Sequence, residues 1–218
     1  MPPIRTFLFD LDGTLIDHFT AIHRSHDHVM RQFGLPAPTM AEVKRAVGLG
    51  LEHAVGTLFG PEHADKVPGA LPLYRDYWAK TMLDDVELLP GAQEFLGALK
   101  KNGAQTAVFT NKHGPSAREV CDKLGLTPLL DGVFGVFDTP WLKPDIRFTA
   151  HVLEKLHATS ATTLLVGDSP FDIKTAHNAH FACWCVSTGT HTAEELAAAG
   201  ADKVFDGLPA VQAALGVR

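Results

Sequence analysis

The amino-acid sequence predicts an α/β fold: a doubly wound (Rossmann-like) parallel sheet core with an inserted all-helical cap domain. Short apolar runs rich in β-branched and aromatic residues alternate with amphipathic segments of helical periodicity. Strands and helices that alternate in this way form right-handed βαβ crossovers in a parallel sheet. The alternation is interrupted once, between the first two apolar runs, by a long segment that has helical periodicity only. We therefore expect a core domain of residues 1–15 and 88–218 and a helical cap domain of residues 16–87.

The core elements follow in order along the chain. The first strand is expected at residues 4–9, where an apolar run leads directly into an acidic segment. Further strands are expected at residues 105–109, 162–166 and 182–186, with weaker candidates at 133–137 and 203–205. Amphipathic helices are expected at residues 93–101, 116–124, 146–157, 172–179 and 192–199. Gly103 and Gly125 follow two of these helices, at the position where a glycine commonly ends a helix.

The segment between residues 16 and 86 contains no convincing strand. Its helical pattern is broken by glycines and prolines, at residues 34–36, 48, 60–61 and 68. Three aromatic residues, Tyr74, Tyr77 and Trp78, lie close together near its end. The run GLG at residues 48–50 lacks the preceding strand of a nucleotide-binding loop. These features favour an inserted helical cap and argue against a nucleotide-binding motif.

Composition excludes several classes of protein. The chain has 218 residues, 45% of them hydrophobic, which suffices for one core and a small accessory domain. Its net charge of −6 argues against a nucleic-acid partner or an anionic membrane surface. No segment approaches the roughly 18 consecutive apolar residues that a membrane span needs. We therefore expect neither nucleic acid nor membrane among its partners.

The cysteines and the N-terminal segment predict a cytoplasmic location. Three cysteines are too few for a disulfide framework and are typical of a reducing compartment. Cys183 and Cys185 face the same side of a predicted strand and are expected to be buried structural thiols rather than metal ligands. Asp10 and Asp12 interrupt the only early apolar run, which argues against a signal peptide.

Two carboxylates, Asp10 and Asp12, follow the first predicted strand within the run DLDGT at residues 10–14. Ending a buried strand on two acidic side chains carries an electrostatic cost unless an opposite charge offsets it. A divalent cation such as Mg²⁺ offsets this cost well, because hard metals prefer oxygen ligands. The pair can also divide the roles of nucleophile and general acid–base between its members. An ordinary turn after a strand is the alternative interpretation of the same residues.

Chemically capable side chains follow other predicted strands as well. Thr110 and Asn111 come directly after the predicted strand at residues 105–109. Lys143 lies near the weaker strand at 133–137, and Asp168 and Asp172 follow the strand at 162–166. The carboxyl ends of parallel strands meet at one edge of a doubly wound sheet, and ligands bind there. The order of these residues along the chain predicts that they form one site with the first pair of aspartates.

These runs together resemble the haloacid dehalogenase superfamily of phosphatases, in the subgroup whose C1-type helical cap is inserted after the first strand. The likeness covers essentially the whole chain. The runs DLDGT at residues 10–14 and GDSPFD at residues 167–172 are its most specific parts. Residues 89–112 and 166–169 are similar to phosphoglycolate phosphatases in particular. The resemblance implies a magnesium-dependent phosphatase that acts on a small phosphorylated metabolite.

The resemblance also implies a role for each candidate residue. Asp10 would be the nucleophile that forms an aspartyl-phosphate, and Asp12 would be the general acid–base. The Mg²⁺ ligands would be the Asp10 carboxylate, the Asp12 backbone carbonyl and Asp168, with water molecules completing the shell. Asp172 would orient metal-bound water rather than ligate the metal. Three groups would stabilise charge on the phosphoryl oxygens: the Thr110 hydroxyl, the Asn111 backbone N–H and the Lys143 ammonium.

Most of these residues also have an ordinary structural explanation. Thr110 could cap the helix that follows it. Lys112 competes with Lys143 for the cationic role, although the Pro-Asp pair after Lys143 matches the family more closely. Asp168 and Asp172 could simply flank a helix N-terminus, where carboxylates are favourable.

Twelve histidines form a high count for this length, and four of them crowd the start of the predicted cap: His18, His23, His26 and His28. They are not spaced as a zinc site and lack an obvious third ligand. We expect them to form a partly solvated polar face, with His18 nearest the mouth of the site.

Several other functions are weighed against the phosphatase. The alternative enzyme is a phosphohydrolase for nucleotides, sugar phosphates or pyrophosphate. A mutase of the β-phosphoglucomutase type is less favoured, because Thr14 stands where those proteins often have valine and Ile22 where they carry a hinge histidine, with His23 adjacent. A dehalogenase proper needs neither Asp12 nor a metal. A non-enzymatic sensor of phosphate or Mg²⁺ has no use for an inserted cap. The protein is expected to be a monomer or a homodimer.

Overall fold

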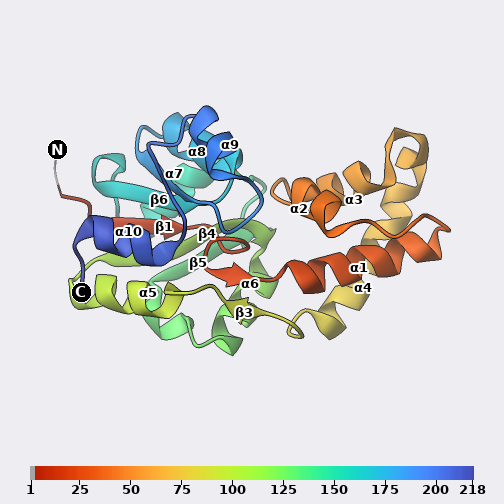
Figure 1. The fold of residues 1–218 in the computed structure, drawn as a ribbon, viewed down its shortest axis with the longest axis horizontal. Coiled ribbons are helices and arrows are strands. Elements are labelled where there is room, and N and C mark those ends of the chain that lie inside the picture. Colours follow the sequence, from red (N-terminus) through yellow and green to blue (C-terminus); the bar gives the residue numbers. More distant parts are fainter. Residues whose placement is uncertain (1–2) are drawn as a thin grey trace.

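The computed structural model describes residues 3–218, so residues 1 and 2 of the expected core segment lie outside the described range. Its main feature is a six-stranded sheet in the order β5-β4-β1-β6-β7-β8, in which every pair of neighbours is parallel (Figure 1). The strands are β1 (Thr6–Phe9), β4 (Gln105–His113), β5 (Gly132–Val136), β6 (Thr163–Gly167), β7 (Ala182–Val186) and β8 (Lys203–Phe205). The predicted parallel sheet is confirmed, and β1 lies near its centre.

Strand β4 is longer than the sequence pattern indicates. It was expected to end at Phe109 but continues to His113, so Thr110 and Asn111 lie inside the strand rather than after it. Beyond an irregularity in register, β4 still pairs with β5 through His113 and Val136. The apolar pattern ends at Phe109 because the side chains of residues 110–113 line a cavity, whereas the backbone pairing of the strand continues to His113.

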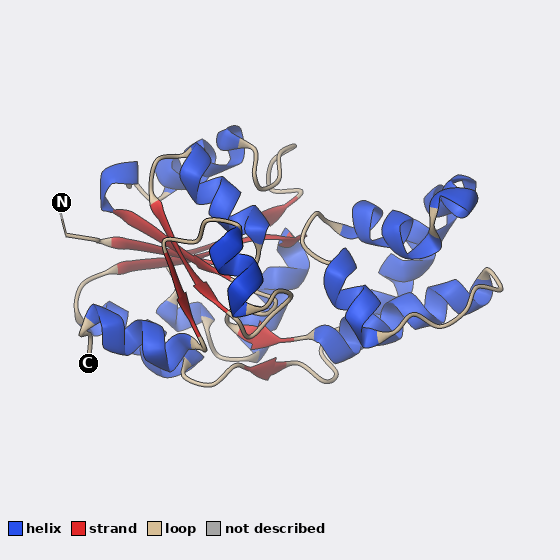
Figure 2. Ribbon diagram, turned by 45° about the horizontal axis from the view of Figure 1, so that its top comes forward, coloured by secondary structure: helices blue, strands red, loops and turns tan. Residues whose placement is uncertain are grey.

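Helices cover both faces of the sheet, as a doubly wound fold requires (Figure 2). One face packs against α5 (Ala92–Lys101), α6 (Gly114–Lys123) and α10 (Leu208–Leu215), and the other against α7 (Ile146–Lys155), α8 (Pro170–Asn178) and α9 (Ala193–Ala198). Short 3₁₀ turns lie at Pro61–Lys66, Thr127–Leu129 and Ser160–Thr162. Helix α10 was not predicted, because its sequence LPAVQAAL is apolar almost throughout and has no clear amphipathic stripe.

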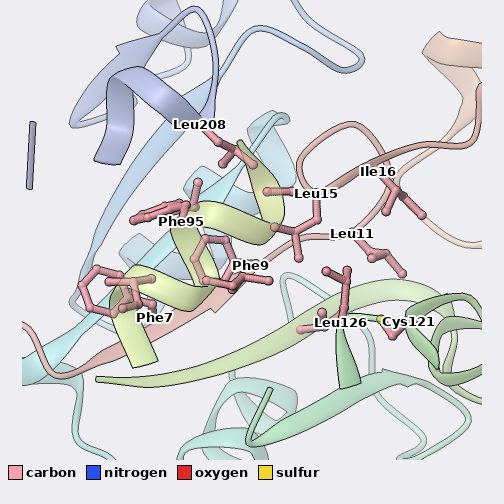
Figure 3. Close-up of a cluster of buried hydrophobic side chains, with 14 of the residues drawn as sticks. Phe7, Phe9, Leu11, Leu15, Ile16, Phe95, Cys121, Leu126 and Leu208 are labelled. Atoms are coloured by element: carbon pink, nitrogen blue, oxygen red, sulfur yellow. The ribbon is translucent and has the colours of Figure 1, made fainter. Parts of the chain in front are cut away.

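The residues of β1 alternate between two hydrophobic clusters, one on each face of the sheet. Phe7 and Phe9 belong to one cluster and Leu8 to the other, because successive strand residues point to opposite faces. The Phe9 ring meets Phe95 of α5 edge to face, with ring centroids 5.6 Å apart (Figure 3). β1 is buried on both faces and lies between β4 and β6. The first polar residue beyond it, Asp10, is therefore fixed at the carboxyl end of a central strand.

A helical insertion (residues 19–81) lies between the first and second strands of the main sheet and extends to one side of it (Figures 1 and 2). It contains α1 (Phe19–Gln32), α2 (Met40–Ala46), α3 (Leu51–Phe59) and α4 (Val67–Thr81). These helices enclose a separate hydrophobic cluster of their own, with Phe59, Tyr74 and Trp78 among its buried residues. The insertion therefore has an independent apolar core.

Two short strands connect the helical insertion to the core. The first of them lies within residues 16–86 and corrects the expectation that this segment contains no strand. Strand β2 (Ile16–Asp17) pairs antiparallel with β3 (Glu87–Leu88). The Leu89 amide also donates to the Leu15 carbonyl at 2.9 Å. Strands of two residues are too short to produce a period-two pattern, so the sequence did not reveal them.

The predicted buried thiols are confirmed. Cys121, Cys183 and Cys185 are all free and buried, and the Sγ atoms of Cys183 and Cys185 lie 3.7 Å apart. Gly103 and Gly125 both have a φ of 70° directly after α5 and α6, as expected for glycines that end helices. Among residues 3–218, none of the helices combines the length and the apolar character that crossing a bilayer requires.

The burial of Phe95 leads to a stability prediction. Phe95→Ala is expected to lower the free energy of unfolding by about 3–5 kcal/mol, because it removes a fully buried ring from the cluster around β1. Urea denaturation followed by far-UV circular dichroism measures the change. The matched control is Phe137→Ala, whose side chain is 68% exposed, and which should change stability by less than about 0.5 kcal/mol. Equal losses in the two variants would contradict the packing described here.

Candidate active site

The predicted site residues converge at the carboxyl edge of the sheet, where β1, β4 and β6 lie side by side. Asp10 follows β1, and its amide donates to the Val166 carbonyl of β6 at 2.9 Å. Thr110 and Asn111 are supplied by the last part of β4. Asp168 directly follows β6. The parallel sheet thus gathers residues that are separated by more than 150 positions in the sequence.

Three carboxylates form an acidic cluster at the centre of the site. Asp10, Asp168 and Asp172 each offer an oxygen within 4.8 Å of the others. Lys143 is the cation that faces them: its Nζ donates to Asp172 Oδ1 at 2.6 Å and lies 3.2 Å from Asp10 Oδ1. Asp10 Oδ1 is nevertheless buried without a directed hydrogen bond. One ammonium therefore faces a cluster of three acidic groups.

The pKa values of the acidic cluster reflect this shortage of positive charge. Burial raises the pKa of Asp10 to about 6, although Lys143 opposes the change. Burial, with the nearby Asp10 and Asp172, raises the pKa of Asp168 to about 8. Despite its own burial, Lys143 has a raised pKa because Asp10 and Asp172 favour its charged form. A divalent cation at this point would relieve the repulsion, so the donor set fits Mg²⁺.

Asp168 is held by donors that the sequence did not single out. Its Oδ2 accepts from the Thr190 amide at 2.8 Å and from the Thr190 hydroxyl at 2.9 Å. The Thr14 hydroxyl donates to the other oxygen at 3.3 Å. Gly189 leaves room for this carboxylate, since a Cβ there would lie 2.0 Å from Asp168 Oδ2. Nothing local in the run GTH after β7 marks it as part of the site.

Asp172 has both carboxylate oxygens occupied. Oδ1 accepts from Lys143, while Oδ2 accepts from the Ser169 hydroxyl at 2.6 Å and from the Ser169 amide at 3.1 Å. The contact with the Ser169 amide belongs to the capping box of α8, in which the N3 side chain accepts from the backbone of the N-cap residue. Asp172 thus caps the helix, as one interpretation of the sequence expected, and also anchors Lys143. These contacts suit the predicted supporting role better than direct ligation of a metal.

Asp12 lies in a different electrostatic environment from Asp10. Lys112 Nζ donates to both of its oxygens, at 3.0 and 2.9 Å. His18 Nδ1 lies 3.5 Å from Asp12 Oδ1. Burial alone would raise the pKa of Asp12, but Lys112 and His18 outweigh it and lower that pKa below the ordinary range for aspartate. The two neighbouring aspartates therefore have pKa values shifted in opposite directions.

The two candidate lysines are used at separate points of the site. Lys143 contacts the acidic cluster, and Lys112 contacts Asp12. Lys112 Nζ also lies 4.6 Å from the ring centroid of Trp78 in α4. From the sequence, both lysines were candidates for the cation that stabilises the phosphoryl oxygens. In the structure each lysine pairs with a different carboxylate, and Lys112 also contacts the helical insertion.

Thr110 and Asn111 make contacts within the protein that their predicted role in phosphate binding did not include. The buried Thr110 hydroxyl accepts from the Lys112 amide at 3.2 Å and favours the charged form of Asp10. The Asn111 side chain clamps the backbone of Lys143, accepting from its amide at 2.7 Å and donating to its carbonyl at 2.9 Å. It also donates to the Gly48 carbonyl of the helical insertion at 2.7 Å. The sequence did not predict any role for Gly48.

The expectation that the histidines of the insertion form a partly solvated face is wrong for two of them. His18 and His26 are buried because they pack against aromatic residues of α4. The ring centroid of His18 lies 4.9 Å from that of Trp78, and the centroid of His26 lies 4.7 Å from that of Tyr74. Within residues 3–218, the acidic cluster is the only group of three or more histidines, cysteines or acids placed to share a metal ion.

A cavity of about 420 Å³ opens over the acidic cluster. Its walls come from both parts of the molecule: Asp10, Asp12, Thr110 and Asp168 line it from the core, and residues of α1, α3 and α4 line it from the helical insertion. The insertion also contacts the core directly, since Arg45 Nη2 donates to Glu195 Oε1 at 2.6 Å. Any small molecule bound at the aspartates is therefore enclosed between the sheet edge and the insertion.

Comparison with known proteins identifies the family. The sequence pattern of haloacid dehalogenase-like hydrolases matches residues 7–186, and the chain belongs to this family. It is 32% identical to the phosphoglycolate phosphatase of Yersinia pestis over 95% of this chain and 93% of that protein. It is 31% identical to the probable phosphatase IndB of Dickeya dadantii over 91% of this chain and 88% of that protein.

Solved structures agree on the fold. A haloacid dehalogenase-like family hydrolase from Streptococcus pneumoniae superposes with a TM-score of 0.88 at 22% identity, covering 98% of this chain and 99% of that one. A structure from Lactobacillus delbrueckii superposes with a TM-score of 0.90 at 21% identity, covering 98% of both chains. The family resemblance and the Rossmann-like fold inferred from the sequence are thus confirmed.

The raised pKa values predict how metal removal changes stability. In EDTA, the melting temperature is expected to fall as the pH rises from about 5 to 9. A raised carboxyl pKa means that the folded state binds the proton more tightly than the unfolded state. The resulting destabilisation is absent below the unfolded value of 3.8 and complete only above about 8. Because Mg²⁺ requires ionised ligands, it should raise the melting temperature more at pH 8.5 than at pH 5.5.

Differential scanning fluorimetry with and without Mg²⁺ checks this expectation. Asp168→Asn should remove most of the pH dependence seen in EDTA, since the pKa of Asp168 is raised further than that of Asp10. Asp206→Asn, an exposed aspartate outside the cluster, is the matched control and should preserve the dependence. A Mg²⁺ effect of equal size at both pH values would contradict the proposed competition between metal and proton.

Proposed function

We propose that this protein is a magnesium-dependent phosphatase that hydrolyses a small phosphorylated metabolite through an aspartyl-phosphate on Asp10. The observation that carries the proposal is the contrast between Asp10 and Asp12. Asp10 lies in the acidic cluster beside Lys143, whereas Asp12 is bound by Lys112 and His18. Two carboxylates with divergent environments can take different roles in one reaction. The phosphatases among the relatives support the same reaction class.

The first step transfers the phosphoryl group to the enzyme. An Asp10 carboxylate oxygen forms a bond to phosphorus while the bond from phosphorus to the leaving oxygen breaks. Asp12 in its acid form gives its proton to that leaving oxygen. Because Lys112 holds Asp12 ionised in the described arrangement, the bound substrate must draw the Lys112 ammonium away from Asp12 during this step. Lys143 and the Thr110 hydroxyl would offset charge on the phosphoryl oxygens.

The second step releases phosphate. A water molecule attacks the phosphorus, the bond between phosphorus and Asp10 breaks, and Asp12 in its base form takes the proton of the water. The return of Lys112 to Asp12 favours that base form. The same residue thus serves as acid and then as base, and Lys112 and His18 supply the environment that lets it do so.

The acidic cluster supports Mg²⁺ as the cofactor. The Asp10 and Asp168 carboxylates and the Asp12 backbone carbonyl would hold the ion, with Asp172 supporting them through Lys143 and Ser169. The buried Asp10 Oδ1, which lacks a directed hydrogen bond, fits a ligand position. When bound, Mg²⁺ would neutralise part of the charge of the acidic cluster and of the phosphoryl group.

We also propose that the helical insertion acts as a cap domain, with residues 16–87 as its extent. Three contacts support this: Asn111 with Gly48, Trp78 with Ser116, and Arg45 with Glu195. A cap that closes over the phosphoryl group excludes bulk water, which strengthens the electrostatic contacts within the site. A sensor of free phosphate would gain nothing from such a cover, so the enzyme is favoured over the binding module.

The relatives make 2-phosphoglycolate the first substrate to assay, because several of them are named phosphoglycolate phosphatases. Nucleotides, sugar phosphates and pyrophosphate form the alternative panel. A structural match to a β-phosphoglucomutase from Bacteroides vulgatus has 19% identity and therefore bears on the fold alone.

Asp10→Asn is expected to abolish Mg²⁺-dependent release of p-nitrophenol from p-nitrophenyl phosphate, with a loss of at least about 10³-fold in kcat, because the nucleophile is removed. A continuous absorbance assay with and without EDTA measures it. Asp206→Asn, an exposed aspartate, should keep full activity. Robust turnover by the Asp10 variant would exclude Asp10 as the nucleophile.

Asp12→Asn is expected to slow turnover by about 10²–10⁴-fold, because a general base is lost. The p-nitrophenolate leaving group needs no proton, so the first step should persist while hydrolysis of the aspartyl-phosphate stalls. Rapid mixing should therefore reveal a burst of about one p-nitrophenolate per enzyme, and intact-mass measurement should find the phosphoryl adduct. Loss of turnover without burst or adduct would place Asp12 in the first step only.

A further inference from the structure

The cavity wall supplied by the helical insertion is apolar and aromatic. Tyr74 and Trp78 of α4 line it together with the aliphatic residues Ile22 and Leu51, and Met82 lies beside them directly after α4. All of the groups proposed to handle the phosphoryl group come from the core instead. The insertion wall therefore faces the part of the substrate that leaves with the alcohol oxygen.

The aromatic residues of this wall are held in fixed positions. The Tyr74 and Trp78 rings are nearly parallel, at an interplanar angle of 17°, with centroids 5.9 Å apart. The Trp78 indole N–H donates to the Ser116 hydroxyl at 3.4 Å, and His26 packs on Tyr74. Ordered rings lose little conformational freedom when a ligand ring packs against them, which favours binding.

Positive charge for an anionic leaving group is scarce. Among the described residues that line the cavity, Arg75 and Lys112 are the only lysines or arginines. Lys112 is occupied by Asp12, and Arg75 is exposed. Burial lowers the pKa of His26 to about 4, so that it adds no charge near neutral pH. Among the described lining residues, a carboxylate on the leaving group would therefore find one exposed guanidinium as the only lysine or arginine not already paired with Asp12.

The cavity is also larger than a glycolate-sized leaving group requires. Its volume is about 420 Å³, whereas a water molecule occupies about 30 Å³ in the liquid. The space beyond the phosphoryl group is thus sufficient for a ring system. Lys112 Nζ lies 4.6 Å from the Trp78 ring centroid, and its transfer to the phosphoryl group would uncover the part of the ring that His18 and Tyr74 do not contact.

We propose that the preferred substrates are phosphomonoesters whose leaving group carries an uncharged planar ring that packs against Tyr74 and Trp78. This inference rests on the proposed phosphatase function and specifies its substrate class. Aromatic surfaces prefer other rings in offset or edge-to-face contact, beyond the gain from burying their area. Small carboxylated esters such as 2-phosphoglycolate lack a group that uses this wall.

The test compares esters whose leaving alcohols have similar acidity, so that intrinsic reactivity does not decide the outcome. We expect kcat/KM for 2-phenylethyl phosphate to exceed that for ethyl phosphate and for 2-phosphoglycolate by at least about tenfold. Phosphate release with Mg²⁺ is the readout. If no ester is hydrolysed in an Asp10-dependent manner, the proposed function fails. If hydrolysis occurs but 2-phosphoglycolate or ethyl phosphate is preferred, only the ring inference is overturned.

Variants test whether the preference for ring-bearing esters depends on the aromatic residues of the cavity wall. Trp78→Leu should lower the ratio of kcat/KM between 2-phenylethyl and ethyl phosphate by about fivefold or more. Trp184→Leu, in β7 and away from the cavity, is the matched control and should keep the ratio. An unchanged ratio in a folded Trp78 variant would overturn the inference. So would a preference for 2-phosphoglycolate that disappears in Arg75→Gln. If Trp78→Leu does not fold, the comparison of kcat/KM between the three esters with the unmodified protein still decides whether the ring inference holds.

Discussion

The interaction on which the site depends is the contact of the Lys143 ammonium with the buried acidic cluster. Burying several carboxylates together is costly, and one ammonium can offset only part of the repulsion. Lys143 is therefore fixed twice, by Asp172 through its side chain and by the Asn111 amide through its backbone. The clamp joins β4, the loop before α7 and the start of α8. The remaining excess of negative charge would favour the binding of a divalent cation, as proposed for Mg²⁺.

The proposed division of labour between Asp10 and Asp12 follows from this arrangement. They are two residues apart, yet each faces a different ammonium, Lys143 or Lys112. Gly13 makes this possible, since its φ of 85° turns the chain, and a Cβ there would lie 2.8 Å from Asp168 Oδ2. The turn that the sequence offered as an ordinary alternative is the geometry that separates the two roles.

The sheet and its strand-end residues could be predicted because both depend on local patterns and one general rule of topology. Asp10, Thr110 and Asp168 each directly follow an apolar run, and parallel strands bring such positions together. Thr190, Gly48 and the pairing of Lys112 with Trp78 could not be predicted in this way. These contacts join segments that carry no shared pattern, and they exist only after the insertion and the core have packed.

The same difference explains why the reaction is easier to infer than the substrate. In the proposed mechanism the phosphoryl group meets charged residues of the core, whose types and order restrict the chemistry. The leaving group meets Tyr74, Trp78 and aliphatic side chains, and a wall of this kind discriminates between similar ligands by only about 10–200-fold for each group. Rejection by unpaired buried polar groups would be stronger, but the insertion side of the cavity offers few of them. The wall therefore favours a chemical class of leaving groups over a single compound, and this enzyme should accept several related esters.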